Sequence, residues 1–221
     1  MIPLRDTEPS FSRPLVTGAL IAVNVLVFLY EFSLDPFTLN WLFSQYGLVP
    51  AKLHYMDLLT SMFLHGGWMH LIGNMWFLWL YGDNVEDILG RKKYLLFYLV
   101  CGIAAGLTQV LVSGESRVPT VGASGAIAGV MGASLIKFPR SKIVTLVPLF
   151  VFVTTMDIPA VFILLYWFAI QFFSGVGNLG SANSTGGEAF FAHIGGFLAG
   201  MLLIVLMGTE PRYRRRQEYN W

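Results

Sequence analysis

The chain has 221 residues, of which 55% are hydrophobic and only 12% are charged. This composition is too apolar for an ordinary soluble domain and indicates a protein embedded in a membrane. The net charge is +1, and the single cysteine, Cys101, excludes an intrachain disulfide and a metal site built on cysteines.

Six apolar runs approach or exceed the roughly 20 residues that a helix needs to cross a bilayer. In chain order they are 15–30 (extendable to Phe32), 58–81, 94–113, 118–136, 158–178 and 189–208. The sequence therefore predicts an all-α polytopic membrane protein. Its six-helix core would cover residues 15–208, between an N-terminal tail, 1–14, and a basic C-terminal tail, 209–221.

A seventh apolar run, 143–156, is shorter than the others. It holds Pro148 near its centre and is flanked by Lys142 and Asp157. These features favour a membrane-surface or re-entrant segment over a seventh span.

Basic residues indicate the orientation, because lysine and arginine near span ends stay on the cytoplasmic side. With six spans, one set of loops holds only Lys52 and Arg117. The other set holds Arg5, Arg13, Arg91, Lys92, Lys93, Lys137, Arg140, Lys142, Arg212, Arg214, Arg215 and Arg216. Both termini are therefore predicted to be cytoplasmic. The basic tail is expected to contact anionic lipid rather than nucleic acid, and no signal peptide is evident.

Ser124 and His193 are the main candidates for chemistry inside the spans. Ser124 is predicted to lie a turn or two into the fourth span and His193 about a turn into the sixth, at similar depths. A serine becomes a nucleophile when a neighbouring base takes its proton, and histidines are the bases available at this depth. Because no carboxylate lies deep in the spans, the residues favour a Ser-His dyad over a triad.

Small residues predict how these two helices meet. Gly125, Gly129 and Ala133 form a stripe beside Ser124, and His193 shares a face with Gly196 and Gly200. Such faces let helix backbones approach closely in lipid, so their contact would bring Ser124 to His193. Taken singly, a glycine-rich stretch indicates packing, and a lone intramembrane histidine equally suits a proton path or a structural hydrogen bond.

Polar residues of the second and other spans have weaker assignments. His70 and Asn74, at i and i+4, share a face and can donate hydrogen bonds to an oxyanion, together with the backbone N–H of Ser124. His65 is expected to support the preceding loop. Asn24 and Gln171 are expected to make interhelical hydrogen bonds.

Three motifs together resemble the rhomboid family of intramembrane serine proteases. They are "GASG" (122–125), "AHIGGFLAG" (192–200) and "HGGWMHLIGN" (65–74), in six spans in the expected order. The resemblance implies a rhomboid-like bundle with Ser124 as nucleophile, His193 as general base, and His70 and Asn74 in the oxyanion hole. It also implies structural roles for Gly122, Glu86 and Gly90.

The resemblance further implies a water-filled cavity opening outward, substrate entry between the second and fifth spans, and no metal or cofactor. Two positions depart from the family. Met56 and Asp57 stand where many members carry a Trp-Arg pair, and Ala128 stands where some carry an aromatic residue that stacks on the base. What orients His193 is therefore left open.

The expected function is an intramembrane serine endopeptidase that cleaves single-span or polytopic membrane proteins near the outer membrane face. The loop 177–187 would serve as a lid or as a hinge for the fifth span. By analogy, a six-span core suggests a prokaryotic plasma membrane. The alternatives are a non-catalytic rhomboid-like protein that binds membrane helices and, less favoured, a small-solute channel or transporter. The oligomeric state has no sequence signal.

Overall fold

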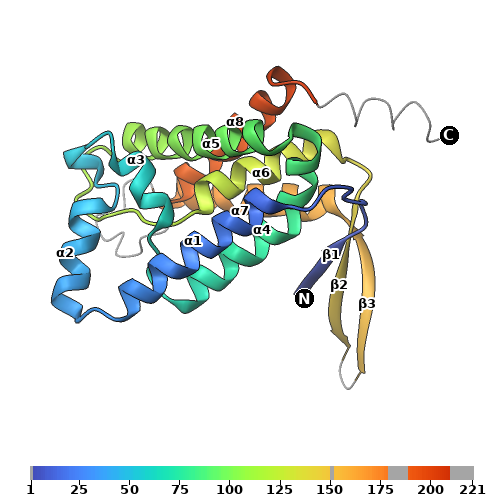
Figure 1. The fold of residues 1–221 in the computed structure, drawn as a ribbon, viewed down its shortest axis with the longest axis horizontal. Helices are drawn as coiled ribbons and strands as arrows, with labels where there is room; N and C mark the ends of the chain where they lie inside the picture. Colours follow the sequence, from blue (N-terminus) through green and yellow to red (C-terminus); the bar gives the residue numbers. More distant parts are fainter. Residues whose placement is uncertain (1, 150–151, 179–188, 210–221) are drawn as a thin grey trace.

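The computed structural model describes residues 2–149, 152–178 and 189–209. Figure 1 shows a bundle of helices with a small sheet at one side. The helices are α1 (Leu15–Phe32), α2 (Pro36–Tyr46), α3 (Asp57–Thr60), α4 (Trp68–Leu89), α5 (Arg91–Val112), α6 (Ser124–Lys137), α7 (Ala160–Asn178) and α8 (Phe190–Leu206). The strands are β1 (Ile2–Asp6), β2 (Lys142–Leu149) and β3 (Phe152–Pro159).

Three helices in the described part of the chain are long and apolar enough to cross a membrane, namely α1, α5 and α7. Helices α6 and α8 are apolar but shorter. Helix α4 is 22 residues long and carries Asp83, Glu86 and Asp87 in its last turns. The chain is thus an integral membrane protein with a mainly helical fold.

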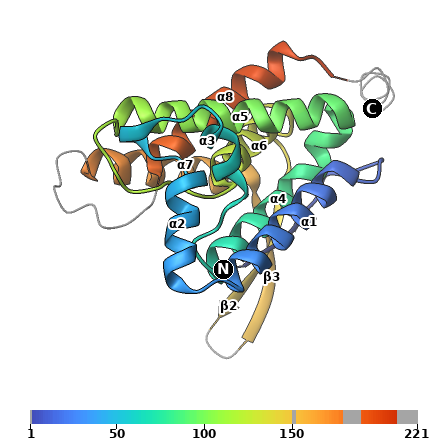
Figure 2. The same ribbon diagram turned by 60° about the vertical axis from the view of Figure 1, so that its left-hand side comes forward.

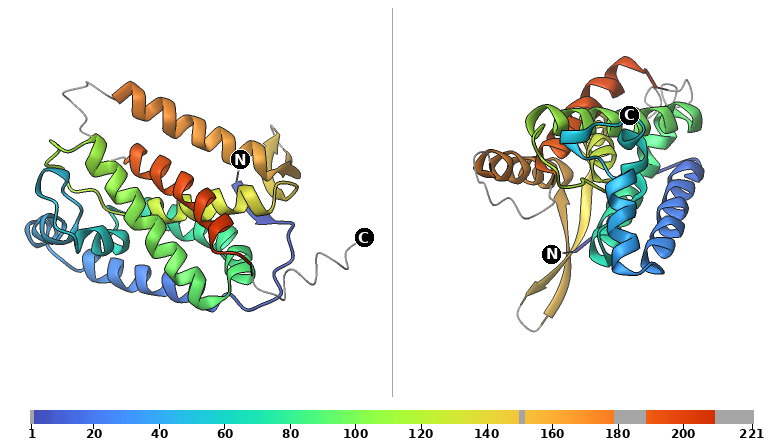
Figure 3. Two further views of the ribbon diagram at one scale, coloured as in Figure 1. Left: turned by 90° about the horizontal axis from the view of Figure 1, so that it is seen from above. Right: turned by 90° about the vertical axis from the view of Figure 1, so that its left-hand side faces the viewer.

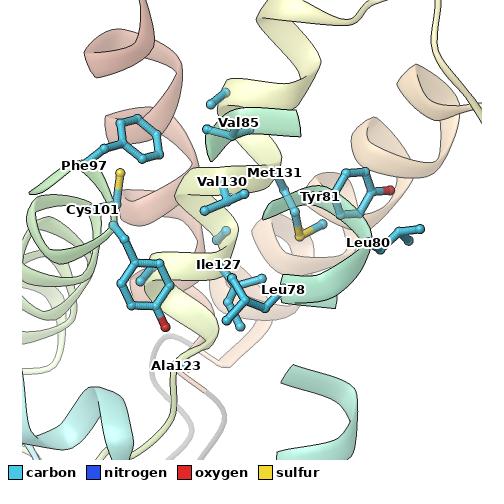
Figure 4. Close-up of a cluster of buried hydrophobic side chains, with 14 of the residues drawn as sticks. Leu78, Leu80, Tyr81, Val85, Phe97, Cys101, Ala123, Ile127, Val130 and Met131 are labelled. Atoms are coloured by element: carbon cyan, nitrogen blue, oxygen red, sulfur yellow. The ribbon is translucent and has the colours of Figure 1, made fainter. Parts of the chain in front are cut away.

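Helix α6 is the centre of the bundle. It contacts α4, α5, α7 and α8, and every residue from Gly125 to Ser134 is buried. Figure 4 shows its side chains Ile127, Val130 and Met131 among those of the neighbouring helices. Helices α1 and α7 lie on opposite flanks (Figure 3). The helix that the others surround, α6, is therefore the shortest of the apolar helices.

Three of the expected helix boundaries are wrong, among them the end of the second run, because α4 continues beyond residue 81 to Leu89. The second long helix begins at Trp68 rather than at residue 58, because Gly66 and Gly67 separate it from the short helix α3. The fourth apolar run becomes helical only at Ser124. The residue two places earlier, Gly122, has a φ of +130°, which L side chains rarely adopt, and it ends an extended segment there.

The expected all-α fold is also wrong, because the chain contains a three-stranded antiparallel sheet in the order β1-β2-β3. The segment expected to lie on the membrane surface or to re-enter is a hairpin, with Lys142 opposite Pro159 and Leu149 opposite Phe152. Its β-branched residues favour strands, and alternate side chains of β2, from Ile143 to Val147, are buried.

The sheet connects two helices of the bundle, as Figures 1 and 2 show. Strand β1, from the expected N-terminal tail, lies against α4. There the Nε1 of Trp76 donates a hydrogen bond to the Pro3 carbonyl over 2.7 Å. Strand β3 runs directly into α7 at Ala160. The sheet thus links α4 to α7: β1 is hydrogen-bonded to α4, β2 pairs with both β1 and β3, and β3 continues along the chain into α7.

Glu86 and Gly90 hold the C-terminal end of α4 in place. The Glu86 carboxylate accepts hydrogen bonds from the backbone N–H groups of Val16 and Thr17, over 3.0 and 2.8 Å, and from the Thr17 hydroxyl, over 2.9 Å. It therefore satisfies donors at the N-terminus of α1 that have no partner within their own helix. Gly90, with a φ of +74°, makes the turn from α4 to α5.

Candidate active site

Ser124 and His193 lie in contact. The Oγ of Ser124 and the Nε2 of His193 are 2.7 Å apart. Ser124 is the first residue of α6, and His193 is in the first turn of α8. The expected placement of Ser124 a turn or two inside a helix is wrong. As a result, its own N–H lies at the helix N-terminus, where backbone donors have no intrahelical acceptor.

Glycines bring the backbones of α6 and α8 together. A Cβ added at Gly196 would collide with the carbonyl of Gly125, and one added at Gly200 would collide with the backbone of Gly129. No larger residue fits at either position without moving a helix. The two faces of small residues therefore fix the distance across which Ser124 and His193 meet.

A cavity of about 220 Å³ adjoins the pair. Its lining residues come from α4, α6, α7 and α8: Met69, His70, Gly73, Asn74, Phe77, Ser124, Ile127, Met131, Trp167 and His193. His70 and Asn74, which lie one turn apart on α4, thus border the same space as the serine and the histidine. The cavity is mostly apolar, and its polar lining residues include His70, Asn74, Ser124 and His193.

The backbone around Ser124 leaves room for the His70 ring. A Cβ at Gly122 would collide with the His70 ring at Nε2, so a glycine is needed there both for its φ and for this contact. The buried Asn74 donates from Nδ2 to the His70 carbonyl over 3.0 Å and retains a second amide hydrogen. Helix α4 therefore brings side-chain donors to the cavity beside the N-terminus of α6.

His65 does not lie on α4. It is buried in the segment before that helix, where its backbone N–H donates to the Glu31 carboxylate over 3.2 Å. Its ring lies 5.2 Å from that of His70, centroid to centroid. The backbone of His65 thus ties the segment before α4 to α1, and the expected supporting role of its side chain stays a prediction.

Two residues of α7 contact His193, and the sequence did not assign them to the site. The Oε1 of Gln171 is 2.7 Å from the Nδ1 of His193, and the Trp167 ring lies 5.6 Å from the imidazole at an interplanar angle of 39°. Gln171 was expected to make an interhelical hydrogen bond. The i, i+4 spacing of Trp167 and Gln171 was the available signal that they share one face.

Among the residues that the structure describes, no three His, Cys, Asp or Glu side chains lie close enough together to hold a metal ion. The loop 177–187, expected to be a lid or hinge, lies outside the described residues from 179 onward. Most of the basic C-terminal tail, from 210, does so as well.

Comparisons with known proteins identify relatives of this chain. A family model described as "Rhomboid domain" matches residues 52–210. The presenilin-associated rhomboid-like protein, mitochondrial, of Homo sapiens is 31% identical over 211 residues, which is 91% of this chain and 50% of that protein. The rhomboid protein 1, mitochondrial, of Saccharomyces cerevisiae is 30% identical over 206 residues, 90% of this chain and 55% of that protein.

A plant relative gives a similar match. The RHOMBOID-like protein 5 of Arabidopsis thaliana is 29% identical over 156 residues, 71% of this chain and 45% of that protein. The chain spans about half the length of these curated relatives. The family model covers well over half of the chain and includes every residue that lines the cavity beside Ser124 and His193. This chain therefore belongs to the rhomboid family.

Proposed function

We propose that this protein is an intramembrane serine endopeptidase that uses Ser124 and His193 as a catalytic dyad. The observation that carries the proposal is the 2.7 Å separation of Ser124 Oγ and His193 Nε2 at the edge of a cavity. A histidine at this distance can take the hydroxyl proton as the serine attacks a carbonyl carbon. The substrates would be single-span or polytopic membrane proteins.

The first chemical step forms a tetrahedral intermediate. As Ser124 Oγ bonds to the carbonyl carbon, its proton moves to His193 Nε2 and negative charge collects on the carbonyl oxygen. The N–H of Ser124 and the side chains of His70 and Asn74 border the space where this oxygen would lie. Donors arranged before the reaction stabilise such a charge more than they stabilise the neutral substrate.

Release of the products follows from the same two residues. His193 returns its proton to the leaving amine, and the first product departs. A water molecule, deprotonated by His193, then hydrolyses the acyl-enzyme and restores Ser124. The scissile segment must be unwound, since a helical peptide bond is hydrogen-bonded and covered by side chains.

The proposed topology has six spans: α1, α4, α5, α6, α7 and α8. It places both termini on the side that holds most of the basic residues and the Ser124–His193 site near the opposite face. Substrate would enter between α4 and α7, which both line the cavity. The named relatives are eukaryotic, two of them mitochondrial by name, and none supports the prokaryotic plasma membrane expected above.

The test is cleavage of a model transmembrane substrate by purified protein in liposomes, together with labelling by a fluorophosphonate probe. Wild-type protein should cleave the substrate in the presence of a chelator and react with the probe. Ser124→Ala and His193→Ala should do neither. Cleavage by Ser124→Ala at the wild-type rate would refute the dyad, and stable substrate binding without any cleavage by the wild type would favour the non-catalytic alternative.

A further inference from the structure

We propose that Gln171, on α7, is a positioning residue for the base. Its side-chain oxygen accepts the Nδ1–H of His193 and so holds the neutral ring with a bare Nε2 facing Ser124. The proposal rests on the proposed function, because it concerns the same dyad. It also answers what orients His193 in a chain where Ala128 replaces the stacking aromatic residue.

The geometry places His193 between two oxygen atoms. Gln171 Oε1 lies 2.7 Å from Nδ1, and Ser124 Oγ lies 2.7 Å from Nε2. A neutral imidazole carries one proton, so one ring nitrogen donates and the other accepts. An amide oxygen can only accept. The proton therefore belongs on Nδ1, and Nε2 is left free to take the proton of Ser124.

The opposite tautomer would be inactive. With its proton on Nε2, His193 would donate to Ser124 Oγ and have no lone pair with which to accept the hydroxyl proton. In soluble triads an aspartate prevents this by accepting from the other ring nitrogen. Gln171 would do the same without a charge, which suits a helix in a membrane because an amide is less costly to bury than a carboxylate.

Trp167 restricts the same ring from a second direction. It precedes Gln171 by one helical turn, and its ring lies 5.6 Å from the imidazole. Both contacts come from α7, whereas Ser124 belongs to α6. The orientation of the base therefore depends on where α7 lies relative to α8.

Gln109 offers a matched comparison. It lies on α5 and accepts a hydrogen bond from the backbone N–H of Ala192 over 3.2 Å, one residue before His193. Each glutamine thus accepts one hydrogen bond from the first turn of α8, but only Gln171 accepts it from the imidazole. Loss of Gln109 would weaken the packing of α8, whereas loss of Gln171 would also release the ring.

The experiment measures kcat, KM and the thermal midpoint of Gln171→Met, Gln171→Glu and Gln109→Met in liposomes with a fluorogenic transmembrane substrate. Rates are normalised to the folded, monodisperse fraction. Gln171→Met should lower kcat about 10- to 100-fold while KM stays within about twofold, because Gln171 does not line the cavity. Gln171→Glu should stay within about threefold of wild type, since it keeps an accepting oxygen.

Gln109→Met should lower the thermal midpoint but keep kcat within about threefold of wild type. If Gln171→Met fails to fold, Gln171→Asn replaces it, with the same expected loss because the shorter side chain draws the oxygen away from Nδ1. Three results would overturn the proposal: wild-type kcat in Gln171→Met or Gln171→Asn, a Gln171→Glu protein as slow as Gln171→Met, or an equal loss of kcat in Gln109→Met. A wild type without Ser124-dependent cleavage would instead overturn the proposed function.

Discussion

At Ser124, the hydroxyl and the first backbone N–H of α6 belong to the same residue, because α6 begins there. Attack by this hydroxyl would leave the developing oxyanion next to the N-terminus of the helix, where the unpaired N–H groups carry partial positive charge. Gly122 makes this possible through its positive φ, which ends the extended segment so close to the serine. In the proposed mechanism, the nucleophile and part of the charge stabilisation would thus come from the first residue of one helix.

Asn74→Ala should lower kcat by about two to three orders of magnitude, because it removes a donor beside the expected oxyanion. Asn24→Ala is the matched control. Each asparagine donates Nδ2 to the carbonyl four residues earlier, over 3.0 Å for Asn74 and 2.7 Å for Asn24, and only Asn74 lines the cavity. Steady-state cleavage should change less than about threefold in the control. Equal losses in both variants would argue against the oxyanion role.

Gly200→Ala should destabilise the protein by at least about 2 kcal/mol, because the added methyl group would collide with the backbone of Gly129. Gly18→Ala is the control, since Gly18 lies within α1 and a Cβ there meets nothing within 4 Å. That substitution should be neutral or slightly stabilising. Thermal unfolding in detergent measures both. A Gly200→Ala protein with wild-type stability would mean that α6 and α8 pack less closely than described.

The main residues of the site could be predicted from the sequence, but their supporting contacts could not. Ser124 and His193 stand out because polar groups are costly in a span, and the glycines beside them limit which faces can meet. Trp167 gives no such signal, and Gln171, although polar, predicts an interhelical hydrogen bond without identifying its partner. Aromatic and amide side chains on a membrane helix also serve packing, and only the rotation of α7 about its axis determines that these two reach the imidazole.

At the level of elements, the sheet is the main departure from expectation. A short apolar segment with a central proline is equally compatible with a surface segment and with a strand, because length and hydropathy do not separate them. What distinguishes the hairpin is its partner: β1 pairs with β2 from more than 130 residues away in the sequence. Long-range pairing of this kind has no local signature in either segment.

The docking of β1 on α4 should weaken as the pH rises. Burial and the nearby Asp83 raise the pKa of Asp6 from 3.8 to about 7, although the hydrogen bond from Asn84 lowers it. Between the two pKa values, Asp6 is therefore mostly protonated when β1 is docked on α4 and mostly ionised when it is not. The contribution of this group to docking is complete below pH 4 or so and is lost as the pH rises through about 7.

Hydrogen exchange of the β1 and β2 amides, corrected for intrinsic rates, measures this effect. Protection in wild type should fall between pH 5.5 and 8. The Asp6→Asn protein should lose that dependence, since its amide does not titrate and its oxygen still accepts from Asn84. Protection within α5 serves as the internal reference. The same pH dependence in wild type and Asp6→Asn would assign it to another group.

For the whole molecule, the single native cysteine permits a direct test of topology. Cys101 is fully buried, so introduced cysteines can be labelled without background from it. Exposed positions exist on both sides of the proposed membrane: Tyr55 and Glu115 on the side facing the site, and Arg13 and Arg140 on the basic side.

In sealed vesicles with the site facing outward, an impermeant maleimide should label Tyr55→Cys and Glu115→Cys at once. It should label Arg13→Cys and Arg140→Cys only after the membrane is permeabilised. Retained substrate cleavage shows that each variant is folded. Labelling of Arg13→Cys and Glu115→Cys from the same side would require an even number of spans between them, with one of α1, α4 and α5 outside the membrane core, and would refute the six-span arrangement.

The sheet also determines how α4 and α7 can move apart. Strand β1 is bonded to α4 through Trp76 and Asn84, and β3 continues into α7 at Ala160. Two rows of backbone hydrogen bonds lie between them. The helices are thus hinged at the Ala160 end of α7. If the sheet stays intact, a movement of α7 away from α4 is smallest at Ala160 and grows toward Gln171. Separation of the two helices to admit a substrate would therefore draw Gln171 away from His193.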